Sequence, residues 1–400
     1  MISFEEARSR VLESVSAMAE TEKMPVQGAL GRVLAQDAIA TFPVPNHDNS
    51  AMDGFAVRHG DLSETAQSVL TVVADLPAGD LITEPLQAGQ AVRIMTGAPI
   101  PPGADCVVIQ EVVQRQGDQL TVPAGQQLKQ NIRDAGEDIA TGTQYLAQGV
   151  QLNPARLGLL TSMGEESVVV YKRPRVAVLS TGNEVVSAGN PLGPGQVYDS
   201  NRTTLMNGLR ALGVEVLDLG LVRDDEAAIR AALERGAEQA DAVISSGGVS
   251  VGDYDLVKKV LAELGQINFW KVAMKPGKPQ AYGNLGSARF FGLPGNPVSS
   301  LAVYLLIVRP ALQKMMGIAD TRAPLLQLPL KGRMKKRHSR IDFQRGTIHW
   351  DGANSCVEST GRQGSGILSS MASADCFIVL PAEPVAYEEG QMVTVQLIQY

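Results

Sequence analysis

The chain has 400 residues, of which 44% are hydrophobic and 19% charged, with a formal net charge of -7. This length exceeds the usual size of one hydrophobic core and predicts roughly two to four domains. Aromatic residues make up only 4% of the chain, which argues against a protein that binds nucleic acid by stacking or through a basic face. We therefore expect a small-molecule ligand and no nucleic-acid partner.

The three cysteines, Cys106, Cys356 and Cys376, are far apart and odd in number. This spacing excludes a disulfide framework and a cysteine zinc site. Residues 1–10 contain no apolar signal core, and no run of about 18 apolar residues occurs. The sequence therefore predicts a cytoplasmic protein with no membrane partner.

The first half of the chain changes character twice. Residues 3–20 predict an amphipathic helix, because Ser3 and Glu6 form a capping box before apolar residues at helical spacing. From 42 to 140, short alternating apolar runs are broken by Gly, Pro and Asp. Such a pattern predicts a small β-rich module.

Apolar strands alternate with helical patterns from 173 to 318. This alternation indicates parallel βαβ units covered on both faces, so we expect a doubly wound α/β domain. Residues 319–400 return to short strands with charges and glycines, which predicts a compact all-β domain. The basic run at 331–340 within it is expected to be a solvated face.

Polar, glycine-containing loops follow the strands of the predicted α/β sheet. Ligands of such sheets bind beyond the carboxyl ends of the strands, and glycine-rich loops that open onto helices expose N–H groups to phosphate. Any one loop alone also fits ordinary turn chemistry. The loops carry Ser180, Thr181, Gly182 and Glu184, then Asp224 and Asp225, then Ser245, Ser246, Gly247, Gly248, Asp253 and Asp255, and finally Asn296 and Pro297.

Three carboxylates, Glu184, Asp224 and Asp255, lie on separate loops at this same sheet edge. Beside a phosphate cradle they suit a divalent cation, magnesium, that bridges carboxylate and phosphate oxygens. The motifs of dinucleotide redox enzymes, P-loop NTPases and HExxH metalloproteases are absent. The four histidines, His47, His59, His338 and His349, are scattered and are expected to be surface or structural residues.

The segment KPGKP at 275–279 places two lysines on a rigid turn. Proline fixes the backbone and glycine lets it approach a ligand closely, so the turn can hold cations for an anionic ligand. The alternative is a surface turn whose lysines face water.

Six segments together resemble the molybdopterin molybdenumtransferase family, the bacterial MoeA family that is similar to the C-terminal domain of gephyrin. They are SAMDGFAV (50–57), RIMTGAPIPPGADCVVIQE (93–111), STGNEV (180–185), SSGGVSVGDYD (245–255), KPGKP (275–279) and GLPGNPVSS (292–300).

The resemblance implies a homodimer of multidomain α/β and β subunits. Each would comprise a linking domain at 1–41 and 141–172, an inserted β-rich domain at 42–140, a molybdopterin-binding α/β domain at 173–318 and a C-terminal β-barrel at 319–400. It also implies a magnesium-dependent reaction in which molybdate and adenylylated molybdopterin yield molybdenum cofactor and AMP. A molybdopterin adenylyltransferase and molybdoenzyme-side cofactor acceptors would be its partners.

The resemblance also implies roles for individual residues. Lys275 and Lys278, beside Pro279, match the lysines that hold molybdate. Weaker candidates for the same anion are Arg345 and Ser365, and Lys271 matches a further active-site lysine. Asp255 fits the metal and phosphate role, although the run GDYD leaves Asp253 open. In the inserted domain, Asp53, Thr96, Arg133 and Asp138 are implied to line a cleft completed by the second subunit.

Two other functions compete with this interpretation. A molybdopterin adenylyltransferase has a similar α/β domain but stands alone at well under half this length. A gephyrin-like dimeric scaffold is the alternative outside enzymes, and the scarcity of aromatic residues argues against it.

Overall fold

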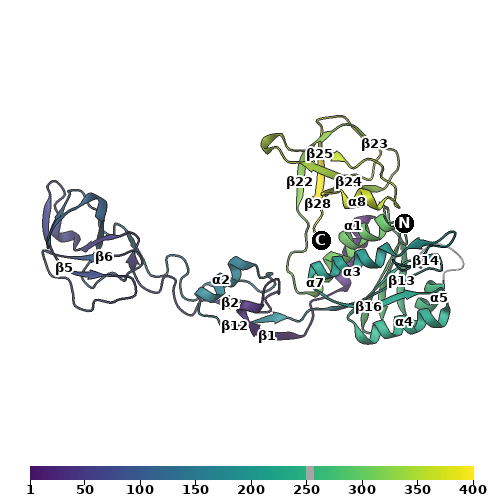
Figure 1. Cartoon of the computed structure of the whole chain (residues 1–400), viewed down its shortest axis with the longest axis horizontal. Coiled ribbons are helices and arrows are strands. Elements are labelled where there is room, and N and C mark those ends of the chain that lie inside the picture. Colours follow the sequence, from purple (N-terminus) through teal and green to yellow (C-terminus); the bar gives the residue numbers. More distant parts are fainter. Residues whose placement is uncertain (249–255) are drawn as a thin grey trace. The chain divides into compact units, whose positions relative to one another are not determined.

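The computed structural model describes residues 1–248 and 256–400. They form two compact units (Figure 1). The first unit comprises Met1–Ala35, Gln148–Asn153 and Ser167–Tyr400, and the second comprises Gln36–Ala147 and Pro154–Glu166. Within the described ranges, no helix combines the length and the apolar character that crossing a bilayer requires.

The second unit is built around a six-stranded sheet. Consecutive residues of its strand β4 (Gly54–Val57) face two different apolar clusters: Phe55 and Val57 belong to one and Ala56 to the other. This alternation is the period-2 pattern of a strand buried on both faces. The other strands are β5 (Ser68–Leu76), β6 (Gln90–Ile94), β7 (Cys106–Ile109), β8 (Gln114–Gln116) and β9 (Gln119–Val122), in the order β7-β4-β6-β5-β9-β8.

Short elements complete the two units. The second unit also holds helix α2 (Pro154–Ser162) and the two-stranded pairs β2 (Ala38–Ile39) with β11 (Gln144–Leu146) and β3 (Asn49–Ser50) with β10 (Ile132–Arg133). The first unit holds the pairs β1 (Thr21–Pro25) with β12 (Ser167–Tyr171), β14 (Val185–Val186) with β15 (Val197–Tyr198), and β23 (Met334–Lys336) with β27 (Val385–Tyr387).

Helix α1 (Phe4–Ser14) begins as predicted but ends early. Ser3 is its N-cap, and the Ser3 hydroxyl accepts the Glu6 N–H at 3.0 Å. The expected helix to residue 20 is wrong, because the backbone turns extended at Val15 and the Met18 N–H bonds instead to the carbonyl of Met315. The segment is thereby tied to the α/β domain.

The α/β domain contains a six-stranded sheet in the order β16-β13-β17-β21-β20-β18. Its first four strands are parallel, as the predicted βαβ units require. Strand β20 runs antiparallel to both of its neighbours, β21 and β18, so β18 again runs in the direction of the first four strands. The strands are β13 (Arg175–Thr181), β16 (Glu215–Val222), β17 (Ala242–Ser246), β18 (Gly265–Lys271), β20 (Pro279–Leu285) and β21 (Ala288–Leu293).

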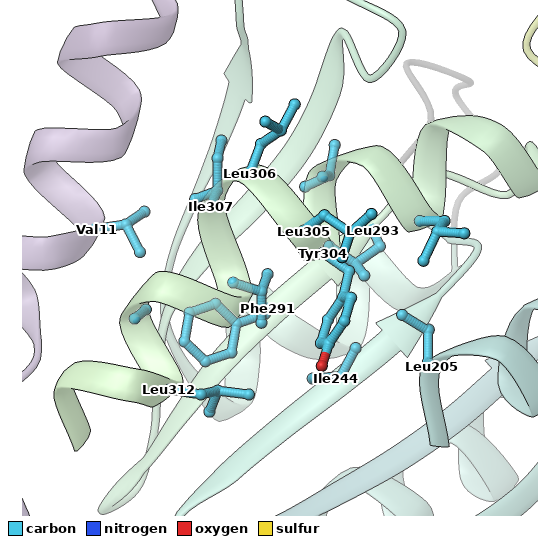
Figure 2. Packing of buried hydrophobic residues seen from close by; sticks show 14 of the residues in the cluster. Val11, Leu205, Ile244, Phe291, Leu293, Tyr304, Leu305, Leu306, Ile307 and Leu312 are labelled. Carbon is cyan, nitrogen blue, oxygen red and sulfur yellow. The ribbon is translucent and has the colours of Figure 1, made fainter. Parts of the chain in front are cut away.

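Helices cover both faces of this sheet (Figure 1). Val176 and Val178 of β13 face one apolar cluster, whereas Ala177 and Leu179 face the other. Figure 2 shows the first cluster, in which residues of α1, α3, β17 and β21 surround the segment that carries Tyr304. The helices are α3 (Ser200–Leu212), α4 (Glu226–Gln239), α5 (Leu256–Leu264), α6 (Pro297–Val303) and α7 (Arg309–Met315).

The long helix expected after Asn296 is interrupted. A π-helical segment, η4 (Tyr304–Val308), separates α6 from α7. Pro310 lies just beyond it and has no backbone N–H, so the regular i to i-4 pattern cannot pass through this point.

The C-terminal region is a closed five-stranded barrel, which confirms the predicted β-barrel. Closure comes from the pairing of β24 with β26 in addition to the order β24-β25-β22-β28-β26. A short strand of the α/β domain, β19 (Met274–Lys275), adds to β24 in parallel. The barrel strands are β22 (Leu325–Lys331), β24 (Ile341–His349), β25 (Cys356–Ser359), β26 (Cys376–Leu380) and β28 (Met392–Leu397), with helix α8 (Leu368–Ala372) beside them.

The basic run at 331–340 is not uniformly solvated. Lys336 is only 3% exposed, and its ammonium donates to the carbonyls of His338, Arg340 and Ala382 at 2.6, 2.9 and 2.8 Å. The expectation of a solvated face is therefore wrong for this lysine, whose three donors are each used to fix the segment that leads into β24.

Candidate functional site

A cavity of about 850 Å³ opens at the carboxyl ends of β13, β17 and β21. Because β16 follows β13 on one side and β17 lies on the other, the strand order reverses at β13, and such a switch point is where open α/β sheets bind ligands. The cavity is lined by Ser180, Thr181, Gly182, Glu184, Val185, Val197, Tyr198, Asp199, Ser200, Asn201, Asp224, Ser246, Gly247, Gly248, Leu256, Val257, Pro279, Pro294, Gly295, Asn296, Pro297 and Gly366. The lining includes ten of the predicted site residues and also Pro297; the ten are Ser180, Thr181, Gly182, Glu184, Asp224, Ser246, Gly247, Gly248, Pro279 and Asn296.

The floor of the cavity is formed by backbone and hydroxyl groups. Gly247 has a φ of 95°, and a Cβ there would lie 2.9 Å from the carbonyl oxygen of Thr181. The loops after β13 and β17 therefore approach each other closely only because position 247 is glycine. The Gly247 N–H is bonded to the carbonyl of Leu293 at 3.1 Å, so the hydroxyls of Thr181 and Ser246 and the other N–H groups of these loops are the donors that suit a phosphate.

Asn201 joins three loops of the cavity. Its Nδ2 donates to Ser246 Oγ at 2.8 Å and to the carbonyl of Gly295 at 2.7 Å. Since Ser246 accepts this bond, its own hydroxyl proton is left to donate to a ligand. Asn201 was not predicted from the sequence, because the three segments it connects are far apart along the chain.

Glu184 and Asp224 place two carboxylates in the same cavity. Asn183 and Asp224 bond each other reciprocally: the Asn183 N–H donates to Asp224 Oδ2, and the Asp224 N–H donates to Asn183 Oδ1, both at 3.2 Å. This pairing holds the loop after β13 against the loop after β16. The Glu184 carboxylate lies over Gly182, where an added Cβ would come within 2.7 Å of it.

Oxygen donors of this kind are the ligands that a hard divalent cation prefers. The third predicted ligand, Asp255, and its alternative Asp253 lie outside the described residues. Among residues 1–248 and 256–400, no group of three or more possible metal ligands is assembled.

A network of paired charges lies at the N-terminus of helix α3. Asp199 caps the helix by accepting the Arg202 N–H, and it also accepts the Ser180 hydroxyl at 3.0 Å. Arg202 in turn reaches Asp218 at 2.6 Å. Burial alone would lower the pKa of the Arg202 guanidinium. The bonds from Arg202 to Asp199 and Asp218 outweigh burial, so the pKa is raised. Asp199 therefore orients Ser180 with its charge already paired.

The lysine turn adjoins the cavity through Pro279, which lines it. Lys278 is exposed, and Lys271 lies opposite Pro279 in the pairing of β18 with β20. Lys275 is half-exposed, and its ammonium lies 3.5 Å from Oδ2 of Asp342. The three predicted lysines thus lie in the turn before Pro279 or on the strand that pairs with it, and none of them is itself a lining residue.

Asp342 is a buried hub that was not predicted from the sequence. Only 1% of it is exposed, and besides Lys275 its Oδ2 contacts Nε2 of His338 at 3.2 Å and Nε2 of Gln344 at 3.1 Å. Burial lowers the pKa of His338, and the positive charges of Lys275, Lys336 and Arg340 lower it further. The negative charge of Asp342 raises the pKa but does not outweigh these effects. The imidazole is therefore neutral at neutral pH.

Arg345 is fully buried and holds a loop. Its Nε donates to Ser370 Oγ at 3.0 Å and its Nη2 to the carbonyl of Gly364 at 3.1 Å, while burial lowers its pKa against the influence of Asp342. In the same loop, the carbonyl of Ser365 accepts a hydrogen bond from the Val298 N–H of α6 at 3.0 Å. Ser365 therefore lies at the rim of the cavity, next to the lining residue Gly366.

The remaining predicted residues lie in the second unit. Oδ1 of Asp53 accepts both the N–H and the hydroxyl of Thr96 at 2.7 Å. These two bonds lower the pKa of the carboxyl despite its exposure to solvent. Arg133 pairs with Asn49 across β10 and β3 and is exposed, as is Asp138. Their predicted place in a cleft shared by two subunits stays a prediction.

Comparison with known proteins decides the family. Three family models match in succession: the MoeA N-terminal region (domain I and II) at residues 2–164, a probable molybdopterin binding domain at 177–314, and the MoeA C-terminal region (domain IV) at 327–398. A molybdopterin molybdenumtransferase from Haemophilus influenzae is 43% identical over 99% of this chain and 98% of that protein. The chain belongs to the molybdopterin molybdenumtransferase family.

Other members of the molybdopterin molybdenumtransferase family agree. The protein of that name from Nostoc is 36% identical over 96% of this chain and 90% of its own length. Gephyrin from Dictyostelium discoideum is 31% identical, and the match covers 95% of this chain but 60% of gephyrin. The solved structure of a molybdopterin biosynthesis moeA protein from Pyrococcus horikoshii superposes with a TM-score of 0.87 at 29% identity, covering 99% of this chain and all of that one. The predicted family and fold class are confirmed.

Proposed function

We propose that this protein inserts molybdenum into molybdopterin, and that its substrates are adenylylated molybdopterin and molybdate. The relatives named molybdopterin molybdenumtransferase support the transferase class. The observation that carries the finer proposal is one cavity with a phosphate-binding floor and a carboxylate wall, adjoined through Pro279 by the turn that carries Lys275 and Lys278. A substrate that contains a pyrophosphate link and reacts with an oxyanion would use the floor, the carboxylates and the lysines.

The floor is assigned to the pyrophosphate. The hydroxyls of Thr181 and Ser246 and the N–H groups of the loops at Gly182 and Gly248 would be donors without formal charge. Such donors hold a phosphate in place while water attacks phosphorus and the bond to the bridging oxygen breaks. The products of that hydrolysis are AMP and molybdopterin.

The lysine turn is assigned to molybdate. Lys275 and Lys278 carry positive charge beside Pro279, and Ser365 lies at the rim. A tetrahedral dianion held there would lie next to the cavity that holds the pterin. We assign Arg345 a positioning role, because its buried guanidinium is already bound to Ser370 and to the loop that carries Ser365.

Magnesium is proposed as the cofactor. Glu184 and Asp224 would hold it together with Asp255, and the donor set is of the oxygen type that this ion takes. When bound, the ion would neutralise the charge that develops on the departing phosphate. The chain's own contribution is to orient Asp224 through its reciprocal bonds with Asn183.

We further propose a cytoplasmic homodimer in which Asp53, Thr96, Arg133 and Asp138 of one subunit complete the site of the other. A molybdopterin adenylyltransferase would supply the substrate, and molybdoenzyme-side acceptors would take the product. Thr96 already fixes the Asp53 carboxylate in its ionised form, as a residue that contacts a metal or a protonated group requires.

The test is to incubate the purified protein with adenylylated molybdopterin and magnesium, with and without molybdate, while AMP is measured. We expect AMP release that depends on magnesium and is coupled to the appearance of molybdenum cofactor. A protein that releases no AMP under any of these conditions contradicts the proposed reaction.

A further inference from the structure

Tyr198 is the single aromatic side chain among the described residues that line the cavity. The chain as a whole is poor in aromatic residues, which make up 4% of it. Tyr198 is nevertheless 47% exposed. Two apolar residues close to it in the sequence are exposed to a similar degree, Val197 by 53% and Leu192 by 45%. Tyr198 and Val197 both line the cavity, and exposed apolar groups at a cavity indicate a contact with a ligand.

The ring is held in place from two sides. Tyr198 belongs to β15, which pairs with Val186 of β14, and the Asp199 N–H that follows it bonds to the carbonyl of Val186 at 2.9 Å. At the other end, the Tyr198 hydroxyl donates to the carbonyl of Asn190 at 3.0 Å. The hydroxyl is thus engaged, while the side chain as a whole keeps enough exposed surface to contact a ligand.

The position of the ring relative to the catalytic loops matters. Val197, the residue before it, donates its N–H to the carbonyl of Glu184 at 2.9 Å, and Asp199, the residue after it, accepts the hydroxyl of Ser180. Tyr198 therefore lies between the carboxylate wall and the start of the phosphate-binding floor.

We propose that Tyr198 stacks on a flat nitrogen heterocycle of the substrate. The proposal rests on the proposed function, which supplies two such rings, adenine and pterin. Hydroxyls and N–H groups of the floor cannot satisfy the face of a ring, whereas an aromatic side chain can.

The test compares wild type with Tyr198→Phe and Tyr198→Leu in the full-length protein. Calorimetry measures the affinity for AMP, for 6-hydroxymethylpterin and for ribose 5-phosphate, which has the phosphate but no ring. We expect Tyr198→Phe to bind the ring ligands within about twofold of wild type, and Tyr198→Leu to bind one of them about five- to a hundredfold more weakly, the range of base–aromatic stacking. Ribose 5-phosphate should bind all three proteins equally.

The outcomes separate the possibilities. A loss confined to AMP identifies adenine as the stacked ring, and a loss confined to the pterin identifies the pterin; either supports the proposal. Pterin fluorescence should be quenched by wild type and by Tyr198→Phe but not by Tyr198→Leu. The proposal is overturned if Tyr198→Leu binds both ring ligands as wild type does, if Tyr198→Phe loses as much as Tyr198→Leu, or if wild type binds neither ring. Failure of the proposed function is different: ring binding persists, but adenylylated molybdopterin gives no AMP.

Discussion

Lys275 and Asp342 are joined twice, by backbone register between β19 and β24 and by a contact of 3.5 Å between the ammonium and the carboxylate. One residue comes from the α/β domain and the other from the barrel. Arg340 adds a bond from its Nη1 to the carbonyl of Met274 at 3.2 Å. The lysine turn is therefore positioned by the barrel as well as by its own proline and glycine.

Asp342→Asn should destabilise the first unit by about 1–3 kcal/mol, because a buried oxygen with three donor partners is replaced by an amide. The ion pair itself contributes less than about 1 kcal/mol of this, since Lys275 is 37% exposed. Urea unfolding followed by fluorescence measures the loss, and both tryptophans, Trp270 and Trp350, report on the first unit. Asp351→Asn, at an exposed residue of the barrel, is the control. An equal loss of stability in the two variants would contradict the claim that the buried contacts of Asp342 stabilise the first unit.

Gly182→Ala should weaken the binding of AMP by about tenfold or more, because the methyl group would meet the Glu184 carboxylate at 2.7 Å and the φ of 138° is unfavourable for alanine. Gly189→Ala is the matched control, since its φ is 93° but a Cβ there meets nothing within 4 Å. Calorimetric titration with AMP measures both. Equal affinities in the two variants would show that displacement of Glu184 has no effect on the site.

Much of this arrangement follows from the sequence. Apolar strands that alternate with helical patterns predicted the α/β domain and the loops at its carboxyl edge. The reversed direction of β20 was not predicted, because strand direction depends on pairings that local periodicity does not encode. The roles of Asn201 and Asp342 were missed for the same reason: each contacts segments 45 or more residues away, and neither lies in a motif.

Thr96→Val should shift the titration of Asp53 to higher pH. The bonds from the Thr96 N–H and hydroxyl favour the ionised carboxylate and lower its pKa, so removing the hydroxyl leaves a carboxyl that keeps its proton to a higher pH. Carbon-13 NMR of the aspartate carboxyls measures the shift. Thr96→Ser retains the hydroxyl and should titrate as wild type; if Thr96→Val does so too, the hydroxyl does not govern this carboxyl.

Gly208→Ala should destabilise the first unit by about 1–3 kcal/mol, because a Cβ in α3 would lie 2.9 Å from the buried ring of Tyr304. Gly158→Ala in α2 is the opposite case: its position is exposed and open, so alanine should stabilise the second unit by about 0.5–1 kcal/mol. Differential scanning calorimetry records both transitions. A stabilising effect at Gly208 would contradict the close packing of α3 on the π-helical segment.

The central claim is that a nucleotide phosphate and an oxyanion occupy adjacent parts of one cavity. A crystal soaked with AMP and tungstate tests it most directly, because tungsten gives an anomalous signal that locates the oxyanion. We predict the AMP phosphate against Gly182, Gly247 and Ser246, with tungstate beside Lys275 and Lys278. AMP or tungstate bound elsewhere on the protein, with this cavity empty of both, would contradict the account.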